Sequence, residues 1–584
     1  MSEVPHTSQV TLPVTSLWAN RKCLIIACIV ATANTQYGFD SAAIGALQAM
    51  PGFLKVFGFE DPNSPVGYGI DSTFQQLIGS LLTLGAFLSS ILAGTFGAFY
   101  GRKTALWLAC ALNCVGLAIQ IGTTNKGVVY LGRIVLGFSN GFLVTFSNIY
   151  TAEIAPAHLR GVMVALFAYW VNIGAILGTI VDNYTKDRLD KGSYQIPIGS
   201  LYIVPVLLAI GLFFVPETPR WLLHHNRESQ ARKSLETLRA DSLAPEYFEL
   251  EWAEIIRGVE EERKTAKSVG LLDMFRGADL RRTLLCWGTI MTQAGSGSWF
   301  PIAYQTYFFQ IAGIKQAFEY SIMITCIGFV GVNCGMYAMR HLVGRRFICI
   351  FGSIVTSLCF LGMAIAQSAS PGTMTTGKVT VAMVAIWGFF YNGIRGPSLF
   401  RVPCSHLLGC VGAATYPVAT ELVSSRLRAW TVGSATSLQY VFAWLTSFCT
   451  PYFINPGDLN WVSLTHSSPE CEAANAWFQG PKYGYIWFGS NIACAIFYFF
   501  CIPEVRIGPE LNMDFANQNQ LKGRSLEEID ELFEKRVGVF KFKTYRTEIQ
   551  EKALHDVQAN TGAFLEKQPA ISHVEVEQSE AKTA

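Results

Sequence analysis

Twelve apolar stretches, each about as long as a membrane-spanning helix, dominate this 584-residue chain. The hydrocarbon core of a bilayer is about 30 Å thick, and a helix needs roughly 20 mostly apolar residues to cross it. Six stretches precede a charged segment and six follow it, at about residues 23–49, 74–99, 104–123, 128–150, 162–182, 195–215, 283–311, 320–342, 347–367, 378–422, 430–453 and 482–502. The sequence therefore predicts an all-α membrane protein built from two six-helix halves.

The composition excludes several other classes of protein. Hydrophobic residues make up 51% of the chain and charged residues 15%, compared with about 25% charge in soluble proteins. The net charge of +2 leaves no basic excess for binding nucleic acid. No hydrolase, phosphate-loop or metal-ligand motif is visible, so we expect neither an enzyme nor a bound cofactor or metal. Most of the 15 cysteines stand singly in apolar runs, as small core residues do.

Lysine and arginine gather in alternate loops, which fixes the expected orientation. Cytoplasmic loops of membrane proteins carry the excess of basic residues. Basic residues follow spans 2, 4, 8 and 10 and fill the segment between the halves. We therefore expect a cytoplasmic tail at 1–20, a bundle at 21–215, a cytoplasmic linker with short helices at 216–282, a second bundle at 283–505 and a cytoplasmic tail at 506–584.

Three short motifs recur in the same order in the two halves, which indicates an internal repeat. Gly101-Arg102-Lys103 reappears as Gly344-Arg345-Arg346, Glu153 with Arg160 as Glu421 with Arg428, and Pro216-Glu217 as Pro503-Glu504. Duplicated halves are typical of transporters that expose a central site alternately to the two sides. Acidic and basic markers at cytoplasmic helix ends predict a gate that locks the halves together; the alternative is that the basic residues only set topology. The predicted cytoplasmic gating residues are Gly101, Arg102, Lys103, Glu153, Arg160, Glu217, Arg220, Gly344, Arg345, Arg346, Glu421, Arg428 and Glu504.

Several runs resemble the sugar porter family of the major facilitator superfamily, over about residues 20 to 535. They are Gly-Arg-Lys at 101–103, Gly-Arg at 132–133, Pro-Glu-Thr-Pro-Arg-Trp-Leu at 216–222 and Lys-Gly-Arg-Ser-Leu-Glu-Glu-Ile-Asp at 522–530. The run at 414–428 is similar to the fungal branch of hexose and disaccharide permeases. The resemblance implies the major facilitator fold with twelve transmembrane helices. It also implies uptake of a hexose or disaccharide across the plasma membrane by a protein that functions as a monomer.

Asp40 lies inside the first span, where a carboxylate is costly. Charged residues at the bilayer centre cost about 2.5–3.5 kcal/mol on insertion scales and usually serve a function. The only obvious partner is Arg133 near the start of span 4. The resemblance implies that Asp40 and Arg133 exchange a proton and an ion pair during sugar–proton symport, since animal facilitators carry Asn in place of the Asp. A permanent structural pair, an uncoupled sugar or polyol facilitator and a transporter-like nutrient sensor remain alternatives.

Span 7 departs from the pattern that the family uses to bind sugar. Gln293, Gly297 and Tyr304 match it, whereas Ala294 replaces a Gln, Trp299 an Asn and Ala303 a Tyr. In span 5, Ala168 replaces another Gln. Because large amides are lost, we expect a wider site with fewer hydrogen bonds to one hexose ring, which fits a disaccharide or an unusual polyol. The predicted substrate-binding residues are Gln293, Gly297, Trp299, Tyr304, Asn172, Tyr169, Asn148 and Gln439. The alternative is that these aromatic and amide groups only hold helices together.

Two segments interrupt the family pattern. Residues 394–409 place charges and prolines inside span 10, where irregular charged backbone is poorly tolerated. Residues 506–521 separate Pro503-Glu504-Val505 from the run at 522–530. Deleting either segment restores a familiar run, so our hypothesis is that both are untranslated sequence retained in the gene model.

Overall fold

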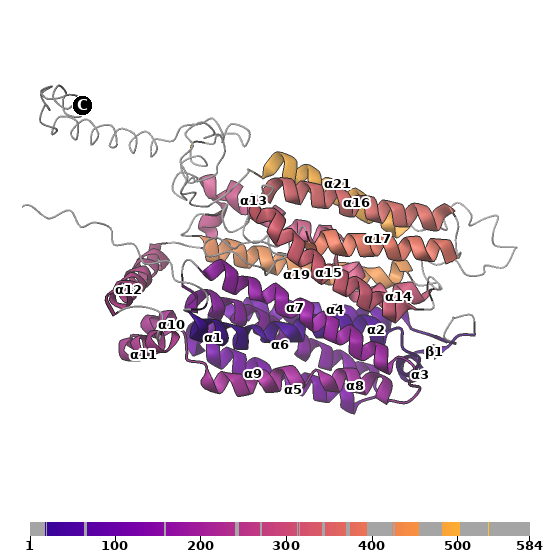
Figure 1. The fold of residues 1–584 in the computed structure, drawn as a ribbon, viewed down its shortest axis with the longest axis horizontal. Helices are drawn as coiled ribbons and strands as arrows, with labels where there is room; N and C mark the ends of the chain where they lie inside the picture. The colour runs from indigo at the N-terminus through magenta and orange to yellow at the C-terminus, as the bar shows by residue number, and fades with distance from the viewer. Residues whose placement is uncertain are drawn as a thin grey trace, which may run out of the picture.

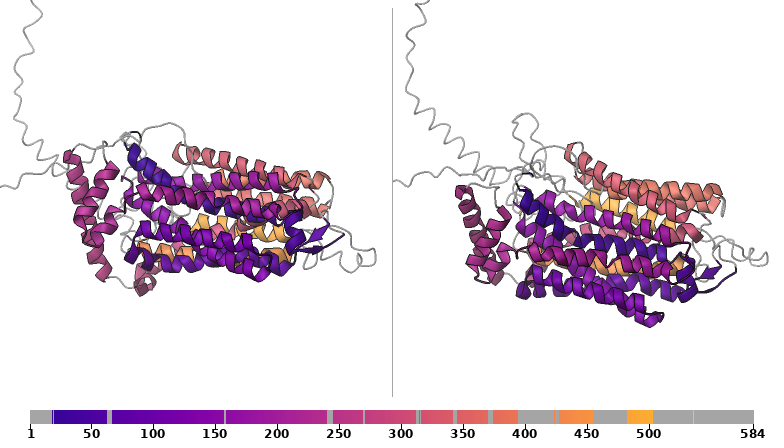
Figure 2. Two further views of the ribbon diagram at one scale, coloured as in Figure 1. Left: turned by 90° about the horizontal axis from the view of Figure 1, so that it is seen from below. Right: turned by 60° about the horizontal axis from the view of Figure 1, so that its bottom comes forward.

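The computed structural model describes residues 18, 20–62, 67–156, 159–239, 245–268, 271–311, 314, 316–341, 345–369, 374–393, 423, 427–454, 482–502 and 535. Its long helices run side by side in two groups, the earlier part of the chain in one and the later part in the other (Figure 1). The two further views keep this arrangement, with the helices of the central linker at one end of the bundle (Figure 2).

The first half contains six hydrophobic segments, two of which are broken into shorter helices. The helices are α1 (Arg21–Ala31), α2 (Ala33–Leu47), α3 (Pro51–Phe57), α4 (Ser72–Tyr100), α5 (Arg102–Gly122), α6 (Lys126–Ile154), α7 (Arg160–Thr185), α8 (Gly192–Ser200) and α9 (Ile203–Phe214). Thr32 separates α1 from α2, and its hydroxyl donates to the Ile29 carbonyl at 2.7 Å. Such a bond from a Thr to its own helix often bends the helix.

A small hairpin closes the end of this half that is remote from the linker (Figure 1). Strands β1 (Phe59–Glu60) and β2 (Tyr68–Gly69) are antiparallel, with Phe59 opposite Gly69 and Glu60 opposite Tyr68. After the hairpin, Asp71 caps α4 by accepting a hydrogen bond from the Phe74 N–H at 3.1 Å. Asp is among the preferred N-cap residues because its side chain satisfies an N–H that the helix leaves unpaired.

The linker and the second half supply the remaining helices. The linker forms α10 (Pro219–His224), α11 (Glu228–Arg239), α12 (Pro245–Ser268) and the 3₁₀ turn η1 (Leu271–Phe275). The second half forms α13 (Gly277–Gly295), α14 (Trp299–Ile311), α15 (Ala317–His341), α16 (Arg345–Ala369), α17 (Met374–Gly393), α19 (Arg428–Ile454) and α21 (Lys482–Cys501). The helix of span 7 thus begins at Gly277, a few residues before the stretch expected to start at 283.

Eight helical segments among the described residues are long and apolar enough to cross a bilayer. The stretches that fall short are spans 1 and 7, which are broken, and spans 10 and 11, which carry more polar residues. Breaks such as those in spans 1 and 7 free backbone groups, and carriers often build their central sites from discontinuous helices of this kind. The predicted insertions at 394–409 and 506–521 lie outside the described residues.

Glycines let α2 and α7 approach closely, which fixes the position of the helix that carries Asp40. A methyl group added to Gly38 would lie 1.9 Å from the Val171 carbonyl oxygen, and one added to Gly174 would lie 2.2 Å from the Thr35 carbonyl oxygen. Small residues at helix interfaces are the usual way in which membrane helices pack, because apolar burial from water contributes little there.

Candidate functional site

Asp40 of α2 and Arg133 of α6 form an ion pair inside the first half. Arg133 Nη1 donates to Asp40 Oδ1 at 2.8 Å, and the two side chains are 1% and 3% exposed. The structure therefore brings together the two residues that the sequence predicts for proton coupling. A buried charge pair of this kind is balanced only while both partners are present, since removing one leaves the other charge without compensation.

Uncharged groups complete the surroundings of the pair. Asn140 donates its amide to Asp40 Oδ2 at 3.3 Å, and Arg133 Nε donates to the Ile78 carbonyl at 3.2 Å. Within the described residues Arg133 Nη2 has no hydrogen-bond partner. Because one guanidinium nitrogen is left unpaired, Arg133 has a donor to spare when the pair rearranges.

A chain of buried amides extends from the pair toward α5. Asn113 donates to Asn140 Oδ1 at 3.2 Å and to the Ser139 hydroxyl at 3.1 Å, and it accepts from Gln36 at 3.0 Å. All four side chains are buried. These residues were not among the predicted site residues, although an amide inside an apolar span is a signal that the sequence carries.

In the second half, Gln293 of α13 and Gln439 of α19 meet directly. Gln439 Nε2 donates to Gln293 Oε1 at 2.8 Å, and the bond is partly buried. Both residues were predicted to bind substrate from separate spans, and the structure places their amides together. A primary amide can both donate and accept hydrogen bonds, so a pair of them is chemically suited to contact a sugar hydroxyl.

The break between α13 and α14 follows Gln293 and is held by α21. The hydroxyls of Ser296 and Ser298 donate to the Gln293 carbonyl at 2.7 and 3.1 Å, and Asn491 donates to the Ser296 carbonyl at 3.0 Å. Gly297 at the break has φ +71, and a Cβ there would lie 2.4 Å from the indole of Trp487. Gly297 is thus a backbone position that needs glycine, rather than a group that contacts sugar.

Trp299 and Tyr304 lie on α14 in different environments. Trp299 is half-buried, and within the described residues its buried indole N–H has no acceptor. Tyr304 is fully buried, and its hydroxyl donates to the Ser447 carbonyl at 2.8 Å. The indole is therefore the group that a polar ligand could satisfy, whereas the Tyr304 hydroxyl already serves the contact with α19.

The remaining predicted sugar contacts lie on α7 and α6. Tyr169 donates to Asn333 Oδ1 of α15 at 2.5 Å, and Asn172 donates to the Ala168 carbonyl of its own helix at 2.8 Å. Asn148 is half-buried near the end of α6 that leads to Glu153. These residues are not brought into one cluster with Gln293, and their roles stay predictions.

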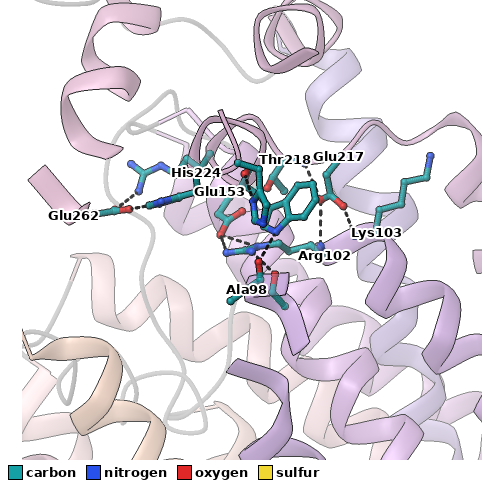
Figure 3. A network of polar contacts seen from close by, with 12 residues as sticks. Ala98, Arg102, Lys103, Glu153, Glu217, Thr218, His224 and Glu262 are labelled. Carbon is teal, nitrogen blue, oxygen red and sulfur yellow. Dashed lines mark hydrogen bonds and ion pairs between the residues drawn. The ribbon is translucent and has the colours of Figure 1, made fainter. Parts of the chain in front are cut away.

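Some of the predicted cytoplasmic gating residues form a network around Glu217 and Arg102 (Figure 3), which joins the first half to the linker; the lock between the two halves stays a prediction. Glu217 accepts hydrogen bonds from the backbone N–H groups of Arg102, Lys103 and Thr218, at 3.3, 3.0 and 2.9 Å. Arg102 donates to Glu153 Oε1 from Nε and Nη2, at 3.1 and 2.8 Å. Burial raises the pKa of the Glu217 carboxyl, and the three N–H donors oppose that rise.

Gly101 and Ala98 shape this network from the turn between α4 and α5. Gly101 has φ +92, and a Cβ there would lie 2.5 Å from Glu217 Oε2. The Trp221 indole donates to the Ala98 carbonyl at 3.1 Å. Glycine is therefore required where the carboxylate approaches the turn.

The other predicted gating residues are only partly described. Arg220 pairs with Glu262 at 3.0 Å; the hydrogen bond from His224 lowers the pKa of Glu262. Arg346 donates to the Phe499 carbonyl. Gly344, Glu421 and Glu504, and the side chains of Arg160, Arg345 and Arg428, lie outside the described residues.

Asp182, a carboxyl that was not among the predicted site residues, is buried near the C-terminal end of α7. It is fully buried, and within the described residues neither of its oxygens has a hydrogen-bond partner. An ionised carboxylate without a donor or counter-charge is very costly in such surroundings. We therefore expect Asp182 to be neutral in this conformation.

This expectation predicts that Asp182→Asn is well tolerated. The free energy of unfolding in detergent should stay within about 0.5 kcal/mol of the unsubstituted protein, because one neutral polar group replaces another of the same size. Thermal unfolding followed by intrinsic fluorescence measures this. A loss above about 2 kcal/mol would show that the protein needs an ionised Asp182.

Two groups of long helices, with two broken spans and a buried ion pair, define a membrane protein of the major facilitator fold. The family model described as "Sugar (and other) transporter" matches residues 26–509, and the chain belongs to this family. It is a membrane transporter rather than an enzyme.

Several curated proteins are similar to this chain over most of its length. The major facilitator-type transporter ecdD of Aspergillus rugulosus is 27% identical, over 87% of this chain and 87% of its own. The low-affinity glucose transporter HXT3 of Saccharomyces cerevisiae is 24% identical, over 91% of this chain and 86% of its own. The high glucose sensor RGT2 of the same yeast is 26% identical, over 89% of this chain and 62% of its own.

A solved structure shows the same fold. The proton:xylose symporter XylE of E. coli, with bound 6-bromo-6-deoxy-D-glucose, is 18% identical with a TM-score of 0.62, over 88% of this chain and 100% of its own. At this identity the likeness concerns the fold alone.

Proposed function

We propose that the protein is a sugar–proton symporter that works by alternating access. The observation that carries the proposal is the buried ion pair of Asp40 with Arg133, at 2.8 Å. The Asp40 carboxyl lies between two helices of one half, and it can either bind a proton or form the ion pair with Arg133. The names of the glucose and xylose transporters that this chain resembles support a sugar as the substrate.

The physical mechanism follows from competition for Asp40. When the carboxyl is ionised, it accepts from Arg133 and Asn140 and holds α2 against α6. When it binds a proton from the outside, the attraction to Arg133 is lost, and the guanidinium can turn to other acceptors. If sugar binding favours the protonated form of Asp40, the carrier takes up the proton and the sugar together. Release of the proton inside the cell would then restore the ion pair with Arg133.

The sugar would bind beside the break in span 7. Gln293, Gln439 and the Trp299 indole provide donors and acceptors there, and the indole also offers a face for stacking on a sugar ring. The large amides lost at Ala168 and Ala294 leave room, which favours a disaccharide or a larger polyol over one hexose ring. The plasma membrane, cytoplasmic termini and a functional monomer belong to the same proposal.

A facilitator without coupling and a nutrient sensor are the competing functions. In a facilitator the ion pair would be permanent and would never exchange a proton. The sensor is favoured by the resemblance to RGT2, of which this chain covers only 62%. A sensor would bind sugar without moving it.

Uptake of a labelled sugar panel by cells lacking their own transporters tests the proposal. The panel should hold hexoses, pentoses, α-glucosides and polyols, each measured with and without an uncoupler. We expect accumulation of at least one sugar, alkalinisation of the medium on its addition, and loss of both with the uncoupler. Uptake that merely equilibrates, unchanged by the uncoupler, would indicate a facilitator, and binding without uptake would indicate a sensor.

A further inference from the structure

Helices α7 and α15 come from different halves and touch at two levels, one at the end remote from the linker and one within the part of each helix that is nearer the linker. At the end remote from the linker, Lys186 directly follows α7 and Glu319 lies in the first turn of α15. Lys186 Nζ donates to Glu319 Oε1 at 2.5 Å, and the side chains are 21% and 46% exposed. This ion pair therefore joins the first half to the second at the outer side.

Further groups hold the Lys186 ammonium in place. It donates to Asn183 Oδ1 at 3.0 Å and lies 5.7 Å from the centre of the Phe318 ring. Glu319 stands near the N-terminus of α15, where a negative charge is favoured by the helix dipole. Because both halves contribute groups, separating them at this end would break the ion pair and the cation–π contact together.

The same two helices are joined again toward the linker end. Tyr169 of α7 donates to Asn333 of α15 at 2.5 Å, and its ring meets the edge of Phe329 at 5.5 Å and 82°. On the other side of the bundle, Ser90 of α4 and Ser437 of α19 lie 3.4 Å apart. The inner side of the described structure is therefore bridged as well as the outer side.

The halves also approach closely at the outer side through α2 and α14. A Cβ added to Gly45 would lie 2.8 Å from the Ala303 carbonyl oxygen. When two rigid halves rock about a central site, one end separates while the other closes. Neither open state can therefore keep both bridges between α7 and α15.

We propose that Lys186 with Glu319 forms an outer latch and that Tyr169 with Asn333 forms an inner latch on one seam between the halves. Breaking the outer latch favours the outward-open state, and breaking the inner latch favours the inward-open state. Tyr169 thus acts as a gating residue rather than as the sugar contact that the sequence predicted. The inference rests on alternating access alone and needs neither a known sugar nor proton coupling.

Hydrogen–deuterium exchange of the full chain in lipid nanodiscs tests both latches without a substrate. The variants are Lys186→Gln, Glu319→Gln, the charge swap K186E/E319K, and Tyr169→Phe. Exchange is read at the outer ends of α2 and α14 and at the inner ends of α4 and α7. The control is Arg188→Gln, whose partner Asp190 lies 4.0 Å away in the same loop of the first half.

We expect Lys186→Gln and Glu319→Gln each to raise exchange at the outer ends about two- to fivefold, the range that partly exposed ion pairs support. The charge swap should restore part of the protection, because it forms the ion pair again but loses the cation–π contact with Phe318 and the favourable negative charge at the N-terminus of α15. Tyr169→Phe should raise exchange at the inner ends instead, and Arg188→Gln should change neither. Outer exchange that stays unchanged in both single variants, or that the swap fails to lower, would overturn the outer latch. Unchanged inner exchange in Tyr169→Phe would overturn the inner one.

Because no sugar is added, these results do not depend on the transport assay. If the latches hold but no sugar drives proton uptake, only the proposed function fails. If uptake is proton-coupled but exchange is unaltered in the variants, only the latches fail.

Discussion

Asp40→Asn should abolish sugar-driven proton uptake, and the sugar concentration inside cells should fall to that outside. The amide cannot take up a proton at physiological pH, so the carrier loses its only proposed site of exchange. Sugar counterflow between equal concentrations should persist, because it needs the central site but no net proton movement. Alkalinisation of a weakly buffered medium and accumulation of labelled sugar measure the two effects.

The same change should also destabilise the protein, because Arg133 keeps a buried charge without its partner. We expect the free energy of unfolding to decrease by about 3–5 kcal/mol. Folding of the variant must therefore be checked by size exclusion and thermal unfolding. Asp71→Asn is the matched control: Asp71 caps α4 through the Phe74 N–H in the same half, and Asn caps helices equally well. Proton uptake that persists in a folded Asp40→Asn protein would assign coupling to another group.

Gly297→Ala should strongly reduce both stability and uptake. Its φ of +71 is left-handed, which costs a residue with a Cβ about 1–2 kcal/mol. The added methyl would also lie 2.4 Å from the Trp487 ring, and overpacking of this kind typically costs about 1–3 kcal/mol more. The backbone between α13 and α14 would then move relative to Gln293. Uptake should therefore decrease by a larger factor than the amount of folded protein does. Thermal unfolding and uptake per folded molecule separate the two effects.

Gly489→Ala provides the control on α21, where a methyl group has no neighbour within 4 Å. It should be neutral or slightly stabilising, because alanine favours a helix over glycine. G297A/W487L should recover the overpacking part of the cost but not the backbone part. Wild-type stability in Gly297→Ala would mean that this break accepts a side chain, contrary to its geometry here.

The spans were predictable because each is a local property of the sequence. A bilayer demands a fixed length of apolar helix, so hydropathy locates segments such as α4 and α6 to within a few residues. The Asp40 carboxyl and its partner Arg133 could also be predicted, because charges inside spans are rare. Asp182 escaped notice because it stands beside the polar residues at the end of its span, where a charge looks ordinary.

The sugar site was less predictable, since side chains at matching positions can serve packing or binding. Gln293 and Gln439 lie 2.8 Å apart although 146 positions separate them in the chain. Tyr304 and Tyr169 carry hydroxyls that look alike in sequence, yet one bonds a backbone carbonyl of α19 and the other a side chain of α15. Which partner each hydroxyl finds depends on how the helices are rotated, and hydropathy does not contain that information.

The order of apolar and charged segments by itself determined that this chain spans a membrane in two repeated halves and that Asp40 lies inside the first span. Only the tertiary structure decided which side chains of different helices meet, as Asp40 meets Arg133 and Lys186 meets Glu319. The reason is that insertion into a bilayer depends on the average character of a segment. Contacts between helices depend instead on rotation and close approach, which glycines such as Gly38 and Gly174 permit.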